Sequence, residues 1–106
     1  MNQDLLAKVT TGLADAIGSD CGLGARVRLD FGADGSVLID ARGVPNRITN
    51  EPGDADCTLQ IAIADFVDMA QGRLNGTAAF MTGRLTIRGD MALAVRFGGV
   101  LRRKEG

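Results

Sequence analysis

This 106-residue chain has few side chains suited to catalysis or metal binding, and their spacing matches none of the common active-site motifs. The sequence has no histidine, which removes the usual base of a serine or cysteine nucleophile pair and the commonest metal ligand. Its two cysteines, Cys21 and Cys57, do not form a Cys-x-x-Cys zinc motif. Gly22 and Gly24 lack the third glycine of a dinucleotide-binding loop. We therefore expect no catalytic residue, no metal site and no cofactor.

Two acidic pairs and one basic stretch are the remaining polar candidates. Asp54 with Asp56, and Asp65 with Asp68, carry the oxygen atoms that bind a hard cation. Helix capping and solvation explain these pairs more simply, because Asp is favoured where helices start. The stretch 84–88 alternates arginine with apolar residues but has no aromatic neighbour, and the net charge is −1. We therefore expect no nucleic-acid binding.

Charge is divided unevenly along the chain. Residues 1–72 hold five basic and eleven acidic side chains, whereas residues 73–106 hold seven basic and two acidic ones. The basic part ends in Arg102, Arg103 and Lys104. This run has two interpretations. It is either a solvated tail or a point of transient contact with an anionic membrane surface, where each basic residue contributes about 1 kcal/mol.

The N-terminal residues, the apolar runs and the cysteines indicate the cellular compartment. The first residues lack the basic and apolar regions of a signal peptide, and no apolar run approaches the ~20 residues of a membrane span. Two cysteines cannot build a disulfide framework. Cys57 lies in an alternating stretch and is expected to be a small buried hydrophobe, while Cys21 falls in a Ser-Asp-Cys-Gly turn. These features favour a reducing, bacterial-type cytoplasm.

Hydrophobic periodicity predicts the helices and strands of the chain. Apolar residues at three- and four-residue intervals predict a helix over 6–17 that ends near Gly18. Alternation over 25–31 and 37–41 predicts two antiparallel strands. The Asp-Gly of 32–35 supplies the hairpin loop between them.

The second half continues with short elements. The sequence predicts an edge strand within 46–51 and a strand over 56–63. A short helix is expected to be capped by Asp65, with Gly72 just past its end, and to bury Phe66, Met69 and Ala70.

The last three predicted elements are one or two helical turns within 76–82, a strand over 84–88 and a final helix. We expect Asp90 to cap that helix and the pair Gly98-Gly99 to interrupt it. Each predicted strand has one apolar and one polar face, which is typical of an antiparallel sheet wetted on one side and covered by helices on the other. We therefore expect one α+β domain over residues 1–106.

Phenylalanine and methionine gather in the second half of the chain, at Phe66, Met69, Phe80, Met81, Met91 and Phe97. Such residues at helical spacing are either plain core or the walls of an adaptable pocket, because the unbranched methionine side chain reshapes around different guests. Composition alone leaves both possibilities open.

The order of elements and the letters of the second half resemble the sterol carrier protein 2 family of lipid-binding domains. The family pattern combines ADxTLxI, an Asp-led helix, a Gly-Lys/Arg-Leu turn and AFMxGxLxIxGDMxLAxxF. This chain reads ADCTLQI at 55–61, DF at 65–66, GRL at 72–74 and AFMTGRLTIRGDMALA at 79–94. The close match covers roughly residues 54–101.

The resemblance implies a mainly antiparallel sheet of about five strands, helices over one face, and an apolar tunnel between them. In the family this tunnel takes fatty acids, acyl-CoA, phospholipid or sterol. The chain would then be a non-enzymatic lipid carrier. Phe80 and Met81 would face Met91 across the tunnel. The residues expected to bind the ligand are Leu59, Ile61, Phe66, Met69, Phe80, Met81, Leu85, Ile87, Met91, Ala94, Phe97 and Leu101.

A second hypothesis uses the same fold differently. The chain could be an accessory or dimerisation domain, for instance within a homodimer, whose apolar groove is filled by its own or a partner's side chains. A groove closed by the residues after Gly98 would favour this hypothesis, and an open groove would favour the carrier.

Overall fold

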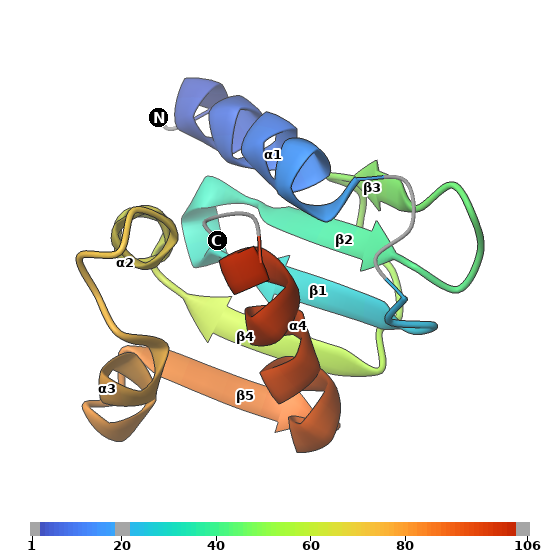
Figure 1. Cartoon of the computed structure of the whole chain (residues 1–106). Coiled ribbons are helices and arrows are strands. Elements are labelled where there is room, and N and C mark those ends of the chain that lie inside the picture. The colour runs from blue at the N-terminus through green and yellow to red at the C-terminus, as the bar shows by residue number, and fades with distance from the viewer. Residues whose placement is uncertain (1–2, 19–21, 104–106) are drawn as a thin grey trace.

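Our computed structural model describes residues 3–18 and 22–103, with side chains described as far as Val100. Figure 1 shows a layer of helices over one face of a single sheet. The elements in chain order are α1 (Gln3–Ile17), β1 (Arg26–Asp30), the 3-10 turn η1 (Gly32–Asp34), β2 (Ser36–Asp40), β3 (Arg47–Thr49), β4 (Cys57–Ile61), α2 (Ile63–Ala70), α3 (Gly76–Met81), β5 (Leu85–Gly89) and α4 (Met91–Arg103).

The sheet has five strands in the order β3-β2-β1-β4-β5. Three neighbouring pairs are antiparallel, whereas β1 and β4 are parallel, with Val27 opposite Cys57. The predicted α+β fold with a mainly antiparallel sheet is therefore confirmed. The edge strand expected within 46–51 is the three-residue β3. Among the described residues, no helix is long and apolar enough to cross a bilayer.

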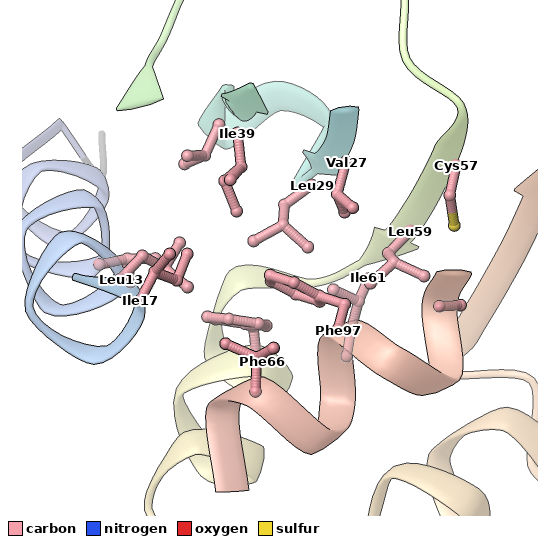
Figure 2. Packing of buried hydrophobic residues seen from close by; sticks show 14 of the residues in the cluster. Leu13, Ile17, Val27, Leu29, Ile39, Cys57, Leu59, Ile61, Phe66 and Phe97 are labelled. Atoms are coloured by element: carbon pink, nitrogen blue, oxygen red, sulfur yellow. The ribbon is translucent and has the colours of Figure 1, made fainter. Parts of the chain in front are cut away.

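The core lies between the sheet and the helices. Strands β1, β2 and β4 alternate as the sequence predicts, and they bury Val27, Leu29 and Ile39 completely. Phe97 of α4 is only 1% exposed and fills the centre of this layer (Figure 2). Burial of one such side chain contributes roughly 1.5–3 kcal/mol, so this packing is the main support of the fold.

Helix α1 is held over β2 and β3 by one of its faces. Leu6 packs against Gly35, where a Cβ atom would lie 2.7 Å from the Leu6 Cδ2 atom. The Asn50 amide donates to Thr10 Oγ1 at 3.0 Å and to the Ser36 carbonyl at 3.1 Å. These contacts orient α1, so that its neighbouring face turns toward α2.

Helix α2 begins earlier than expected. The sequence predicts a cap at Asp65, but the helix starts at Ile63 after the extended residue Ala62, which makes no side-chain capping bond. Ile63 is buried, and the burial of this side chain draws the first turn toward the core. The helix ends at Ala70, and Gly72 lies just past its end as predicted: the Gly72 N–H donates to the Met69 carbonyl and the next residue's N–H to the Asp68 carbonyl.

Helix α4 does not break at Gly98-Gly99, which corrects the sequence-based expectation. It runs without interruption from Met91 to Arg103. Glycine costs a helix about 1 kcal/mol per residue relative to alanine, but Phe97 and Val100 are buried on either side of the pair and hold the helix together. The expected cap by Asp90 is confirmed, since its Oδ1 atom accepts from the Leu93 N–H at 3.1 Å.

Candidate functional site

A pocket of about 670 Å³ opens between α1, α2 and α4. This volume lies in the range of small-molecule sites, about 300–1,000 Å³. The α2–α3 connection, residues 71–75, closes part of its border. The pocket is therefore formed between helices, whereas the space between the sheet and α4 is filled by core side chains.

One stripe of α1 forms the first wall. The lining residues of this helix recur at three- and four-residue intervals and are Leu5, Lys8, Val9, Gly12, Leu13 and Ala16. Val9 and Leu13 are buried and form the floor, whereas Lys8 and Gly12 are exposed and lie at the rim. This stripe neighbours the one that holds Leu6 and Thr10 against the sheet. The contacts of α1 with β2 and β3 thus position the wall.

Helix α2 forms the opposite wall. Phe66 is 5% exposed, and its ring lies 5.5 Å from the ring of Phe31, with 52° between the ring planes. Figure 2 shows Phe66 and Leu13 reaching from two different helices into the same interior. Met69, one turn after Phe66, is half-buried and extends this apolar wall toward Gly76. The two helices therefore present apolar faces to one shared space.

Two glycines leave the room that the pocket occupies. Gly12 of α1 and Gly98 of α4 both line it, and a Cβ atom added to either would meet no atom within 4 Å. Both lie inside helices with ordinary backbone angles, so the turns themselves do not require glycine. The missing side chains are therefore a feature of the cavity.

Of the residues predicted to bind a ligand, two line this pocket, namely Phe66 and Met69. Others are buried between sheet and helices, namely Leu59, Ile61, Leu85, Ala94 and Phe97, and Ile87 is partly buried against them. The side chain of Leu101 lies outside the described residues, as do those of Arg102, Arg103 and Lys104. Ligand contact at these positions and membrane contact at the basic end stay predictions.

Ligand contact at the three residues expected to form opposite walls of a tunnel stays a prediction. Phe80 is 46% exposed, Met81 79% and Met91 49%, and none of them lines the pocket. Val95 of α4 is also 69% exposed, and we call these four exposed apolar residues, two on each helix, the α3–α4 surface. Helix α3 precedes β5 and α4 follows it, so the two apolar groups flank opposite ends of that strand (Figure 1).

Except for Phe66 and Met69, the sequence-based prediction missed the lining of this pocket, including the α1 wall, the α2–α3 connection and Gly98. The resemblance begins near residue 54 and carries no diagnostic letters for α1. One signal was present, because Gly12 stands inside an otherwise regular amphipathic helix, where glycine costs about 1 kcal/mol. The pair Gly98-Gly99 predicts a helix break, and a predicted break gives no indication of a cavity wall.

The titratable groups with perturbed pKa values do not line the pocket. Burial, together with the charge of Asp90, raises the pKa of the Cys57 thiol above its ordinary value. Cys57 is therefore a protonated core residue and not a nucleophile. The Arg42 guanidinium holds the pKa of Asp40 at about 2 through hydrogen bonds at the surface. Among described residues, no group of three or more acidic or cysteine side chains could hold a metal ion.

Curated proteins similar to this chain include longer ones. Hydroxysteroid dehydrogenase-like protein 2 of Rattus norvegicus is 40% identical over 64 residues, which are 58% of this chain and 12% of that protein. Sterol carrier protein 2 of Homo sapiens is 33% identical over 66 residues, which are 61% of this chain and 12% of that protein. The chain thus corresponds to a small part of the curated relatives that it matches.

A solved structure and a family model identify the fold and the family. The sterol carrier protein domain 2 of Helicoverpa armigera has a TM-score of 0.75 at 24% identity, with 97% of this chain and 90% of that chain covered. At this identity the likeness shows the fold alone. Residues 22–102 match the model of the SCP-2 sterol transfer family. Because that match extends over most of the chain and the fold agrees, this chain belongs to the SCP-2 sterol transfer family.

Proposed function

We propose that this chain is a non-enzymatic lipid carrier, and that the pocket between α1, α2 and α4 takes the apolar part of the ligand. Membership of the SCP-2 sterol transfer family supports a lipid ligand. The observation that carries the proposal is the apolar pocket of about 670 Å³, whose floor is formed by Val9, Leu13 and Phe66. Fatty acids, acyl-CoA, phospholipids and sterols are the candidate ligands.

Apolar burial supplies the binding energy in this proposal. Each Å² of apolar surface removed from water contributes about 25 cal/mol, so a ligand gains affinity in proportion to the length that the pocket covers. The loss of ligand freedom opposes this gain. No proton transfer is required, which agrees with a pocket whose described lining contains no acidic, histidine or cysteine side chain.

A leucine in place of Gly98 tests the proposal, because its side chain would project into the pocket. Gly99 is the matched control, since it follows Gly98 in the same helix, does not line the pocket, and its added Cβ would also meet no atom within 4 Å. Both variants replace a helical glycine and carry the same propensity gain.

The measurement is displacement of a fluorescent fatty acid, together with mass spectrometry of lipid extracted from each purified variant. We expect Gly98→Leu to weaken probe binding by at least tenfold and Gly99→Leu to leave it unchanged. Equal binding by both variants would move the site away from this pocket. Absence of probe binding and of co-purified lipid in the unsubstituted protein would overturn the carrier itself.

The α3–α4 surface favours a second candidate function. Phe80 and Met81 on α3, and Met91 and Val95 on α4, expose apolar atoms, and a protein partner could cover one or both of these groups. The chain would then be an accessory or dimerisation domain on the same fold. Light scattering distinguishes the candidates: a stable dimer that Met81→Asp dissociates would support this function, and a monomer at all concentrations would oppose the homodimer.

A further inference from the structure

The polar side chains at the pocket rim carry hydrogen-bond donors and no carboxylate. Of the described residues that line the pocket, Lys8 is the only charged one, and the amides of Gln71 and Asn75 are the other polar side chains. Lys8 and both amides belong to exposed residues, whereas the floor below them is apolar and buried. The pocket is therefore amphipathic, with donors around an apolar interior.

Lys8 is available to a ligand. It lies on α1 directly before the floor residue Val9, and it makes no ion pair or hydrogen bond with any residue in 3–18 or 22–103. Asp4 stands four residues earlier on the same helix, yet it forms no ion pair with a cation among the described residues. A lysine ammonium carries three N–H donors and no acceptor, so an anion is its favoured partner.

The α2–α3 connection adds donors on the other side of the pocket. Asn75 Oδ1 accepts from the Thr77 N–H at 2.8 Å and from the Ala78 N–H at 3.3 Å, so this atom caps α3. The Nδ2 group of Asn75 is then the part of the amide left for a ligand. The side-chain amide of Gln71 forms no hydrogen bond within the described part of the chain, so its NH₂ group can also donate to a ligand.

We infer that the ligand is an anionic amphiphile, whose acyl chain lies in the pocket and whose carboxylate or phosphate contacts Lys8 at the rim. Lys8 is then the residue that sets the preference for a charged over a neutral lipid. This inference rests on the proposed function. A charge-assisted hydrogen bond at an exposed rim is screened by salt, so the preference is expected to be roughly tenfold at low ionic strength and smaller at high salt.

Ligands with one common chain test the headgroup alone. Palmitate, hexadecanol and hexadecyl phosphate share the same chain length and differ in charge. We expect the unsubstituted protein to bind palmitate roughly tenfold more tightly than hexadecanol, because one charge-assisted hydrogen bond separates them. Tighter binding of hexadecyl phosphate than of palmitate would identify a phosphate headgroup, and the reverse order would identify a free fatty acid.

Substitutions then assign the preference to Lys8. Lys8→Gln should weaken palmitate binding while leaving hexadecanol binding unchanged, and Lys8→Arg should retain the preference because it retains the charge. Arg88→Gln is the control, since Arg88 is an exposed cation of β5 that does not line the pocket and forms no ion pair within 3–18 or 22–103. It removes the same charge without touching the site.

Two failures would be distinguishable. If none of the three ligands binds and no lipid co-purifies with the protein, the proposed function is wrong. If hexadecanol binds as tightly as palmitate, or if Arg88→Gln reduces the preference as much as Lys8→Gln, the pocket still holds lipid and only the role of Lys8 is overturned.

Discussion

The pocket and the α3–α4 surface are built from the same kinds of residue, yet they differ in what surrounds them. In the pocket, Phe66 of α2 and Leu13 of α1 face a shared space, and Phe66 is 5% exposed. On the α3–α4 surface, Met81 is 79% exposed. An apolar side chain therefore lines a cavity only where a second element stands opposite it.

The connections between elements explain this difference. The α2–α3 connection forms part of the border of the pocket. Gly12 and Gly98 have no side chain and leave space between its walls. By contrast, α3 and α4 are separated along the chain by the whole of β5, so their exposed residues flank opposite ends of the strand (Figure 1). Substitutions in the two regions should therefore differ in their effects on stability and on ligand binding.

The largest expected effect comes from truncating one phenylalanine in each region. Phe66→Ala removes a buried ring in contact with Phe31 and should lower the free energy of unfolding by about 3–5 kcal/mol. Phe80→Ala changes a ring that is 46% exposed and should cost clearly less, about 1 kcal/mol or below. Urea denaturation measures both. Equal losses would mean that the two regions are equally buried in solution.

Met81→Asp completes this test on the binding side. The exposed Met81 does not line the pocket, so the charged variant should keep its affinity for a fluorescent fatty acid. If Met81→Asp abolished binding while Gly98→Leu did not, the ligand would lie against the α3–α4 surface, and the comparison would be reversed.

The second effect concerns the glycines that join β5 to its neighbouring helices. Both Gly89 and Gly83 have positive φ, at 91° and 80°, but a Cβ at Gly89 would lie only 2.5 Å from the Asp56 carbonyl oxygen. Gly83→Ala should destabilise by about 1–2 kcal/mol through backbone strain alone. Gly89→Ala should lower the melting temperature further, because the backbone of β4 must also move. Similar losses for both would show that the contact relaxes without cost.

The third effect separates pocket glycines from structural ones. Gly12 and Gly98 lie inside helices and face open space, so Gly12→Ala and Gly98→Ala should each raise the free energy of unfolding by about 1 kcal/mol. The same variants reduce the pocket and should weaken binding of long acyl chains more than of short ones. A stabilised protein with unchanged chain preference would indicate that these glycines do not shape the site.

The smallest effect comes from the Cys57 thiol. Burial raises the pKa of this group above the ordinary value of 9.0, so its neutral form stabilises the fold below that value, and the stability is lost as the pH rises through the raised pKa. In a Cys21→Ser background, we expect alkylation of Cys57 to be slow in native protein and fast in urea. Rapid labelling in the native state would show that the core beneath α4 opens and exposes Cys57.

Local patterns predicted most of the fold. Alternation placed β1, β2 and β4, and the spacing of apolar residues placed α1, because both periods follow from backbone geometry. The signals at Gly72 and Asp90 also held, since a helix end and a cap involve only neighbouring residues. The errors at Asp65 and at Gly98-Gly99 arose where burial of Ile63 and Phe97 outweighed a local propensity.

Periodicity and motif letters predicted most of the elements, the α+β class and the family, because both are properties of short stretches of chain. Which apolar residues share a cavity depends on the tertiary structure. The walls of the pocket come from α1 near the start of the chain, α2 in the middle and Gly98 near the end. No local pattern relates positions so far apart, since burial of a side chain depends on which other elements pack beside it.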